Sequence, residues 1–296
     1  MSDNIAYTLS RTSQELGSRL AVTEAQSGRS CTFSELDRYA DRYGANLEKE
    51  GVSSGDRVML MVRPSIDFIA LAFALFRIGA PVILIDPGMG YKNLLRCIAG
   101  VKPDYLIGVP TVIALSFLYA AKFRSLKKRF CCGNFLGIRK LDIRKQRELP
   151  QPPLHTFTPD ESSLAAIIFT TGSTGPPKGV RFEHSIFSAQ LEKIRSFYGI
   201  GPGDVDQPGF PLFALFSTAL GAHAVIPDMD PTKPAQVDPR RFVDSIQHYQ
   251  VTYSFGSPAI WQVVSHYCSQ NNIRCKSLKK VLMAGAPVSG ALVEKA

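Results

Sequence analysis

The segment from Asp56 to Asp86 limits the fold more than any other part of the chain. It begins with DRVMLMV (56–62), an apolar run of strand length, and ends with a second such run, PVILID (81–86). Between them, residues 65–79 are apolar on almost every side and long enough for a helix. Two apolar strands joined by a buried helix are typical of a βαβ unit, in which helices cover both faces of a parallel sheet. The segment therefore predicts an α/β fold.

The stretch SIDFIALAFALFRIGAPVILI (65–85) is too interrupted to be a transmembrane helix. Asp67, Arg77 and Pro81 break it, and its helical part ends at Gly79, short of the ~20 residues that span a bilayer. We expect a buried helix followed by a buried strand. Within that helix, we expect Arg77 to pair with a carboxylate or to extend its charged end to solvent.

Further helices and strands alternate along the chain. TFSELDRYADRYGANLEKEG (32–51) opens with a capping box and carries apolar residues at helical spacing until a glycine ends it. DYLIG (104–108) and the helix expected after Pro110 repeat the strand–helix pattern. A proline-rich connector (147–163) precedes another strand, LAAIIF (164–169). With 296 residues and 45% hydrophobic content, the chain can bury a substantial core.

The loop TTGSTGPPKGV (170–180) follows that last strand directly and predicts a polyphosphate site. Its glycines allow the backbone to approach a bulky anion, and its hydroxyls and backbone N–H groups offer donors. One lysine adds a mobile positive charge. The candidate ATP-binding residues are Thr170, Thr171, Gly172, Ser173, Thr174, Gly175, Lys178 and Gly179.

This loop differs from the two common nucleotide-binding motifs. In G-x-x-x-x-G-K-[ST] the lysine follows glycine at once, whereas Pro176 and Pro177 separate Gly175 from Lys178 here. The dinucleotide motif G-x-G-x-x-G does not occur in the loop. The alternative is a surface turn that binds no ligand. It does not account for so many hydrogen-bond donors directly after a buried strand.

The segment FTTGSTGPPKGV (169–180) closely resembles the phosphate-loop signature of the acyl-adenylate-forming superfamily. FALFRIGAPVILIDP (73–87) resembles a core segment of that superfamily, and VLMAGAPVSG (281–290) resembles its adenine-binding segment. This resemblance implies ATP and Mg²⁺ as cofactors and the transfer of AMP to a carboxylate. It also implies that Lys178 stabilises phosphate charge during catalysis, and that the adenine contacts Gly285, Ala286 and Pro287.

The substrate prediction also depends on resemblance. FPLFALF (210–216) has alanine where the superfamily often has histidine or an aromatic residue, and this region together with YSFGSPAIW (253–261) is similar to the olefin-pathway β-lactone synthetases. That likeness implies a long-chain 3-hydroxy acid as substrate and a β-lactone as product, with a coenzyme A thioester as the alternative. It places four residues near an acyl tunnel, for which core packing is the competing interpretation: Phe213, Ala214, Phe255 and Pro258.

Later motifs of the superfamily do not occur before Ala296. These are a Y-G-x-T-E-like motif, a T-G-D motif and a small domain with a catalytic lysine. We therefore expect an incomplete N-terminal domain, with parallel-rich sheets flanked by helices, without the barrel subdomain or the C-terminal domain, and with an exposed sheet edge. The expected lobes are 1–54 with 205–296, and 55–204. A non-catalytic nucleotide- or acyl-binding module is a second possible function.

The formal net charge of +9 is concentrated in one stretch. Residues 122–147 contain ten lysines and arginines against one acid, Asp142, so the rest of the chain is neutral overall. The stretch could contact an anionic membrane or olefin-pathway proteins, or it could be a solvated surface. Nucleic acid is excluded because no aromatic platform or helix-turn-helix pattern accompanies the charge.

The remaining features indicate a cytoplasmic protein. The N-terminus lacks the pattern of a secretion signal, and the six cysteines have no metal-ligand spacing, so we expect reduced thiols. We expect His184 to start a helix or to support the site from behind rather than to act in catalysis. Asp228 and Asp230 are interpreted as a capped turn rather than a metal site. Trp261 fits the core as well as a lipid-facing pocket.

Overall fold

The computed structural model describes residues 4–135, 137, 142–150, 154–170 and 177–294. The chain forms two compact units. Unit 1 comprises Met1–Arg11 and Glu35–Glu192, and unit 2 comprises Thr12–Ser34 and Lys193–Ala296. Each unit contains one six-stranded sheet.

Unit 1 is built on a sheet with the strand order β6-β5-β3-β4-β7-β8. Its strands are β3 (Val58–Met61), β4 (Val82–Leu84), β5 (Tyr105–Gly108), β6 (Lys128–Cys131), β7 (Leu164–Thr170) and β8 (Lys178–Glu183). All neighbouring strands are parallel except β7 and β8, which are antiparallel. The predicted α/β class is confirmed, and four predicted strands occur within two residues of their expected ends.

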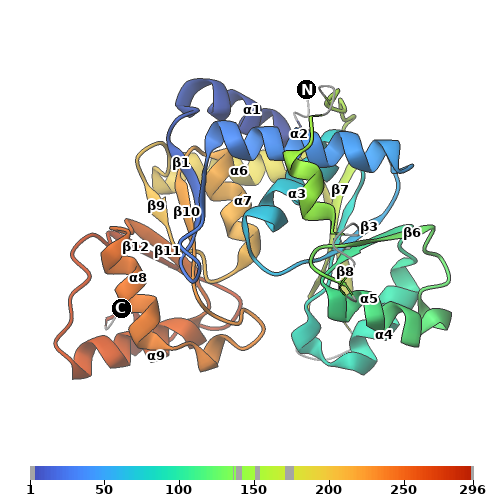
Figure 1. Ribbon diagram of the computed structural model, residues 1–296. Coiled ribbons are helices and arrows are strands. Elements are labelled where there is room, and N and C mark those ends of the chain that lie inside the picture. The colour runs from blue at the N-terminus through green and yellow to red at the C-terminus, as the bar shows by residue number, and fades with distance from the viewer. Residues whose placement is uncertain (1–3, 136, 138–141, 151–153, 171–176, 295–296) are drawn as a thin grey trace. The chain divides into compact units, whose positions relative to one another are not determined.

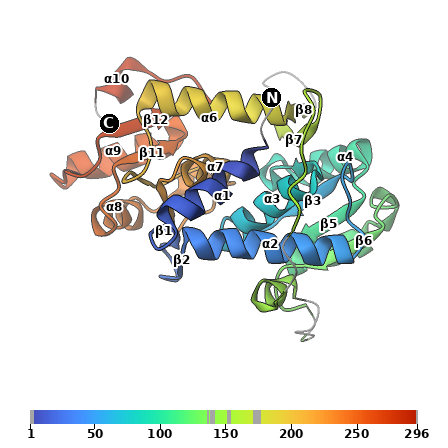
Figure 2. The ribbon, with the colours of Figure 1, turned by 90° about the horizontal axis from the view of Figure 1, so that it is seen from above.

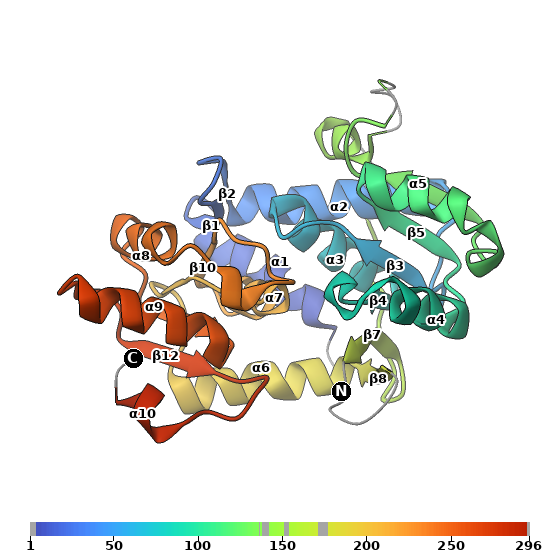
Figure 3. The same cartoon turned by 90° about the horizontal axis from the view of Figure 1, so that it is seen from below.

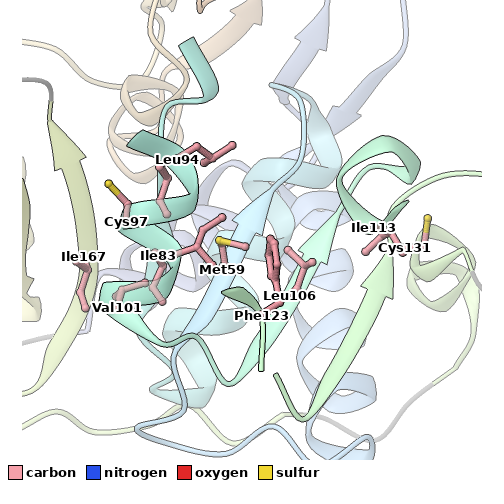
Figure 4. Close-up of a cluster of buried hydrophobic side chains, with 12 residues drawn as sticks. Met59, Ile83, Leu94, Cys97, Val101, Leu106, Ile113, Phe123, Cys131 and Ile167 are labelled. Carbon is pink, nitrogen blue, oxygen red and sulfur yellow. The ribbon is translucent and has the colours of Figure 1, made fainter. Parts of the chain in front are cut away.

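Helices cover both faces of this sheet (Figure 1). They are α2 (Phe33–Lys49), α3 (Ile66–Ile78), α4 (Tyr91–Val101) and α5 (Pro110–Leu118), with parts of α1 (Ile5–Leu16) and α6 (His184–Tyr198) and the short helices η1 (Pro87–Met89), η2 (Ala120–Lys122) and η4 (Ile143–Glu148). On one face, Met59, Ile83 and Leu106 pack against Leu94 and Val101 of α4. Figure 4 shows these side chains in one contiguous cluster. Because β-strand side chains alternate, the intervening residues of the same strands face the opposite layer.

Helix α3 is buried along its whole length, as its composition predicts. Ser65 caps its first turn, and Gly79 ends it in the left-handed conformation at φ 78°. Glycine is required there because an added Cβ would lie 2.5 Å from the Phe157 ring. The backbone N–H of Phe157 also donates to the Arg77 carbonyl at 2.6 Å. The predicted connector therefore contributes to the packing of unit 1.

The buried cation of α3 joins it to the neighbouring helix. Arg77 is 1% exposed and forms ion pairs with Asp37 and Asp41 of α2. Its guanidinium also donates to Ser10 Oγ of α1 at 3.0 Å. The predicted carboxylate pairing is confirmed. Residues 35–49 belong to unit 1 together with α3, whereas the predicted lobe grouped them with 205–296.

Unit 2 has the strand order β12-β11-β9-β10-β1-β2. Its strands are β1 (Leu20–Glu24), β2 (Ser30–Thr32), β9 (Val205–Asp206), β10 (His223–Ile226), β11 (Tyr253–Gly256) and β12 (Lys280–Met283). Only β1 and β2 are antiparallel. Its other helices are α7 (Pro211–Ala219), α8 (Pro239–His248), α9 (Pro258–Gln270), α10 (Gly290–Val293) and the short η5 (Pro234–Gln236).

Strand β12 lies at one edge of this sheet, next to β11, and each of its four residues is partly exposed. Figure 2 shows β11, β12, α8 and α9 grouped together in this unit. Their core contains Phe242 and Ile246 of α8 and Trp261 of α9, with Val281 and Met283 of β12 against it. Among the described strands, β12 therefore has a neighbour on one side only.

A buried carboxyl group connects β9 to α7 in unit 2. Asp206 is fully buried, and its Oδ2 is hydrogen-bonded to Ser217 Oγ, which also lies 2.9 Å from the Phe213 carbonyl oxygen. The Ser217 hydroxyl donates to Asp206. Burial nevertheless raises the pKa of Asp206 to about 8, because desolvation outweighs this hydrogen bond.

In the parts of the chain that the structure describes, no helix combines the length and apolar composition needed to cross a bilayer. The six cysteines, all within those parts, form no disulfide with one another.

We predict that Arg77→Ala lowers the free energy of unfolding of the chain by about 3–5 kcal/mol, because it leaves two partly buried carboxylates without their cation. Arg38→Ala is the control, since Arg38 is 49% exposed and lies 4.0 Å from Glu35, and its loss should cost less than about 1 kcal/mol. Urea denaturation followed by circular dichroism measures both. Equal effects of the two substitutions would contradict the role assigned to Arg77.

We predict that Asp206 makes the chain less stable as pH rises from 6.5 to 8. The folded state holds a proton that the unfolded chain has released, so stability falls by up to about 1.4 kcal/mol per pH unit in this window. Burial lowers the pKa of His223 and of His184 to about 4 each, so their contributions rise with pH and are complete only about one unit above the unfolded pKa of 6.5. They oppose the Asp206 contribution below that pH, and they are the same in an Asp206 variant.

Asp206→Asn should remove that slope, and Asp244→Asn, at an exposed ion pair in the same unit, should retain it. Trp261 is the only tryptophan of the chain and lies in unit 2, so its fluorescence during urea denaturation reports on this region. An unchanged slope in Asp206→Asn would show that another group carries the proton.

Candidate nucleotide and acyl site

The predicted phosphate loop connects the two strands of a hairpin in unit 1 (Figure 1). Strands β7 and β8 are antiparallel, and Thr170 pairs with Lys178 at their adjoining ends. Lys178 therefore lies at the mouth of the loop, on the first residue of β8, and it is exposed. This geometry differs from that of the common nucleotide-triphosphatase loop, in which the lysine begins a helix.

Gly179 is needed for the close pairing of this hairpin. An added Cβ would lie 3.1 Å from Ile167 Cγ2 and 3.1 Å from the Phe169 ring, tighter than ordinary contact. The absence of a side chain therefore keeps β8 against β7 and fixes the start of the strand that carries Lys178.

The structure brings part of the predicted loop together. The backbone of Thr170 adjoins Lys178 and Gly179. The other predicted phosphate-binding residues lie outside the described residues; they are Thr171, Gly172, Ser173, Thr174 and Gly175. Their role remains a prediction from the sequence.

In unit 2, the segments that follow β9, β11 and β12 meet at one edge of the sheet. These strands are parallel, so their carboxyl ends lie at the same side. The Gly209 N–H donates to the Phe255 carbonyl at 2.6 Å, and the Ala284 N–H donates to the Gly256 carbonyl at 3.4 Å. In open α/β sheets, ligands bind at this edge.

The predicted adenine segment follows β12 at that edge. Gly285, Ala286 and Pro287 are all exposed, and Gly285 has φ 93°, a conformation that favours glycine. The backbone of this segment is therefore open to a ligand at the end of the sheet.

The predicted acyl residues divide into two kinds. Phe213 of α7 and Phe255 of β11 stack with ring centroids 3.4 Å apart and planes 10° from parallel, and both are partly exposed. Ala214 and Pro258 are buried. The stacked rings thus present an apolar surface at the carboxyl edge of the sheet, whereas the other two residues lie in the core behind it.

Four further residues that the sequence singled out are packed or paired within the fold. His184 begins α6, is 1% exposed, and its ring lies 5.9 Å from that of Phe76. Asp228 pairs with Arg241 at 2.8 Å, and Asp230 accepts hydrogen bonds from Thr232 within a turn. Trp261 is 2% exposed and belongs to the core.

The sequence prediction missed the polar support behind the aromatic pair. Asp206 and Ser217 hold the α7 turn that carries Phe213, through the hydrogen bond to the Phe213 carbonyl. The sequence did indicate polar side chains here, since Ser217 and Thr218 interrupt the otherwise apolar segment PLFALFSTAL (211–220). The acidic partner gave no such signal, because VDQP (205–208) has no strand-like pattern.

Two curated proteins are similar in sequence to this chain. The chain is 36% identical to an olefin beta-lactone synthetase of Xanthomonas campestris, over 99% of this chain and 53% of the relative. It is 39% identical to an olefin beta-lactone synthetase of Stenotrophomonas maltophilia, over 86% of this chain and 46% of the relative. The chain therefore spans about half the length of these curated relatives.

Solved structures share the fold. A long-chain-fatty-acid-CoA ligase of Archaeoglobus fulgidus matches 100% of this chain and 60% of its own, with a TM-score of 0.86 and 20% identity. The N-terminal domain of FACL13 of Mycobacterium tuberculosis matches 99% of this chain and 72% of its own, with a TM-score of 0.81 and 18% identity. The family described as AMP-binding enzyme matches residues 9–296, and the chain belongs to that family.

Proposed function

We propose that this chain carries the nucleotide- and acyl-binding part of an enzyme that activates a long-chain 3-hydroxy carboxylic acid with ATP. The observation that carries the proposal is the hairpin mouth, where Lys178 adjoins the backbone of Thr170 beside the hydroxyl- and glycine-rich loop. Membership of the AMP-binding family and the names of the two curated relatives support it.

In the proposed first step, a carboxylate oxygen of the acid attacks the α-phosphorus of ATP. A P–O bond forms to the acid, the bond to the β-phosphate oxygen breaks, and pyrophosphate leaves. Lys178 and the loop donors would bind and orient the phosphates and offset their charge, which lowers the barrier by positioning and electrostatic stabilisation.

In the proposed second step, the 3-hydroxyl oxygen attacks the activated carbonyl carbon. A C–O bond closes the four-membered ring, the hydroxyl proton is lost, and AMP leaves. The partly exposed Phe213–Phe255 pair would contact the hydrocarbon chain, since its apolar surface lies at the ligand-binding edge of the unit 2 sheet.

Mg²⁺ bound to the phosphates would supply further charge neutralisation. Among the described residues, no group of three or more His, Cys, Asp or Glu side chains could hold a metal ion. We therefore assign no metal ligand to them.

We predict that ATP raises the melting temperature of the chain and that Lys178→Ala weakens this binding about tenfold or more, because a charge-assisted hydrogen bond is lost. Lys193→Ala, at an exposed lysine of α6, is the matched control and should bind like the unmodified chain. Thermal melts across an ATP titration yield the apparent affinities. An equal response of the two variants would remove the support for a phosphate site at the hairpin.

The product distinguishes the candidate activities. The full-length enzyme that contains this chain is incubated with ATP and a long-chain 2-alkyl-3-hydroxy acid, with and without coenzyme A, and the products are identified by mass spectrometry. We expect a β-lactone without coenzyme A. A thioester in place of the lactone would favour an acyl-CoA ligase, and saturable ATP binding without either product would favour a binding module.

A further inference from the structure

Many positive charges of the basic stretch 122–147 are paired with carboxylates in the structure. Half of its eight described basic residues form ion pairs: Lys127 with Asp56 and Asp104, Lys128 with Glu50, Arg144 with Asp142, and Arg147 with Asp67 and Glu148. These charges are used within unit 1. They therefore contribute little attraction to an external partner.

Four cations of this stretch have no carboxylate partner among the described residues. Lys145 lies on η4, and the other three lie in or beside one structural element. Lys122 ends η2, and Arg124 follows it; both are exposed. The Arg129 guanidinium lies 4.6 Å above the Phe117 ring, and its Nε donates to Ser116 Oγ at 2.8 Å, both on α5. Three of the four unpaired cations of the stretch thus lie at the carboxyl end of α5.

The same end of α5 carries exposed apolar side chains. Phe117 is 58% exposed, Leu118 is 75% exposed and Tyr119 is 40% exposed. The alanines at 114, 120 and 121 are exposed as well. Figure 3 shows α5 beside β5, and only Ile113 and Ser116 of this helix are buried. Three large apolar residues in succession are unusual on a free protein surface.

We propose that the carboxyl end of α5 and η2, residues 117–124, docks on an anionic lipid bilayer. Phe117, Leu118 and Tyr119 would enter the boundary between headgroups and acyl chains, and Lys122, Arg124 and Arg129 would face the lipid phosphates. An apolar tip bordered by lysine and arginine is the combination that interfacial membrane segments use. A tyrosine beside the apolar residues fits the headgroup level, where its ring and hydroxyl meet different surroundings.

Charge complementarity favours a bilayer over a protein as the occupant. The tip has no carboxylate among residues 110–124, so every charge it presents is positive. A membrane also requires no matching shape, whereas a specific protein partner does. Apolar insertion and electrostatic attraction act together here, and each alone gives only weak and reversible binding.

The test measures co-flotation of the chain with vesicles of phosphatidylcholine alone or mixed equally with phosphatidylglycerol. We expect flotation with the anionic vesicles at low salt, and a decline as salt rises. Leu118→Glu should weaken this binding about tenfold or more, because it removes an inserting side chain and adds a negative charge. Leu149→Glu makes the same change at another exposed leucine of unit 1, and it should bind like the unmodified chain.

A charge variant tests the second half of the proposal. Lys122→Glu with Arg124→Glu should weaken anionic-vesicle binding about tenfold or more at low salt. Lys193→Glu with Lys276→Glu alters the net charge equally, at exposed lysines of unit 2, and should have a much smaller effect. Circular dichroism melts of all variants establish that they fold.

Four outcomes would overturn the proposal. These are no flotation with any vesicle, equal flotation with neutral and anionic vesicles, equal losses in the tip and control variants, and concentration-dependent self-association that Leu118→Glu abolishes without any vesicle binding. The last would identify the tip as an interface between copies of the chain, and size-exclusion chromatography detects it.

Discussion

Parallel strand pairing is the constraint on which the rest of this structure depends. Strands in parallel order place their carboxyl ends at one edge of the sheet, and both faces must then be covered by helices. Every pair of neighbouring strands in the two sheets is parallel apart from one antiparallel strand at an edge of each. The candidate ligand-binding segments consequently follow strand ends, while the central strands, such as β3 and β5, are apolar and largely buried.

Buried polar groups hold the helices that cover these sheets. Arg77 joins α3 to α2 through two carboxylates, and Asp206 joins β9 to α7 through Ser217. The two groups avoid the free-energy cost of a buried, unpaired charge in different ways. The arginine is paired with two carboxylates, whereas burial raises the pKa of the Asp206 carboxyl group to about 8.

Much of unit 1 could be predicted because its elements are specified by nearby residues. The apolar runs at 56–62, 81–86 and 164–169 became β3, β4 and β7, and the capping box at Thr32 and Glu35 marked the start of α2. Strand β8 was not predicted, since KGVRFE alternates poorly and its residues are mostly exposed. Pairing with β7, rather than its own pattern, makes it a strand.

The sequence alone determined the α/β class, the phosphate-loop motif and the resemblance to adenylate-forming enzymes, because strand and helix periodicity and glycine-rich turns are local properties. Tertiary structure alone decided the strand order, as in the pairing of Val22 with Ala224, and which lysines and arginines of the basic stretch remain unpaired. Such contacts join residues far apart in the chain. Their formation depends on the burial and charge balance of the whole unit, which no short pattern records.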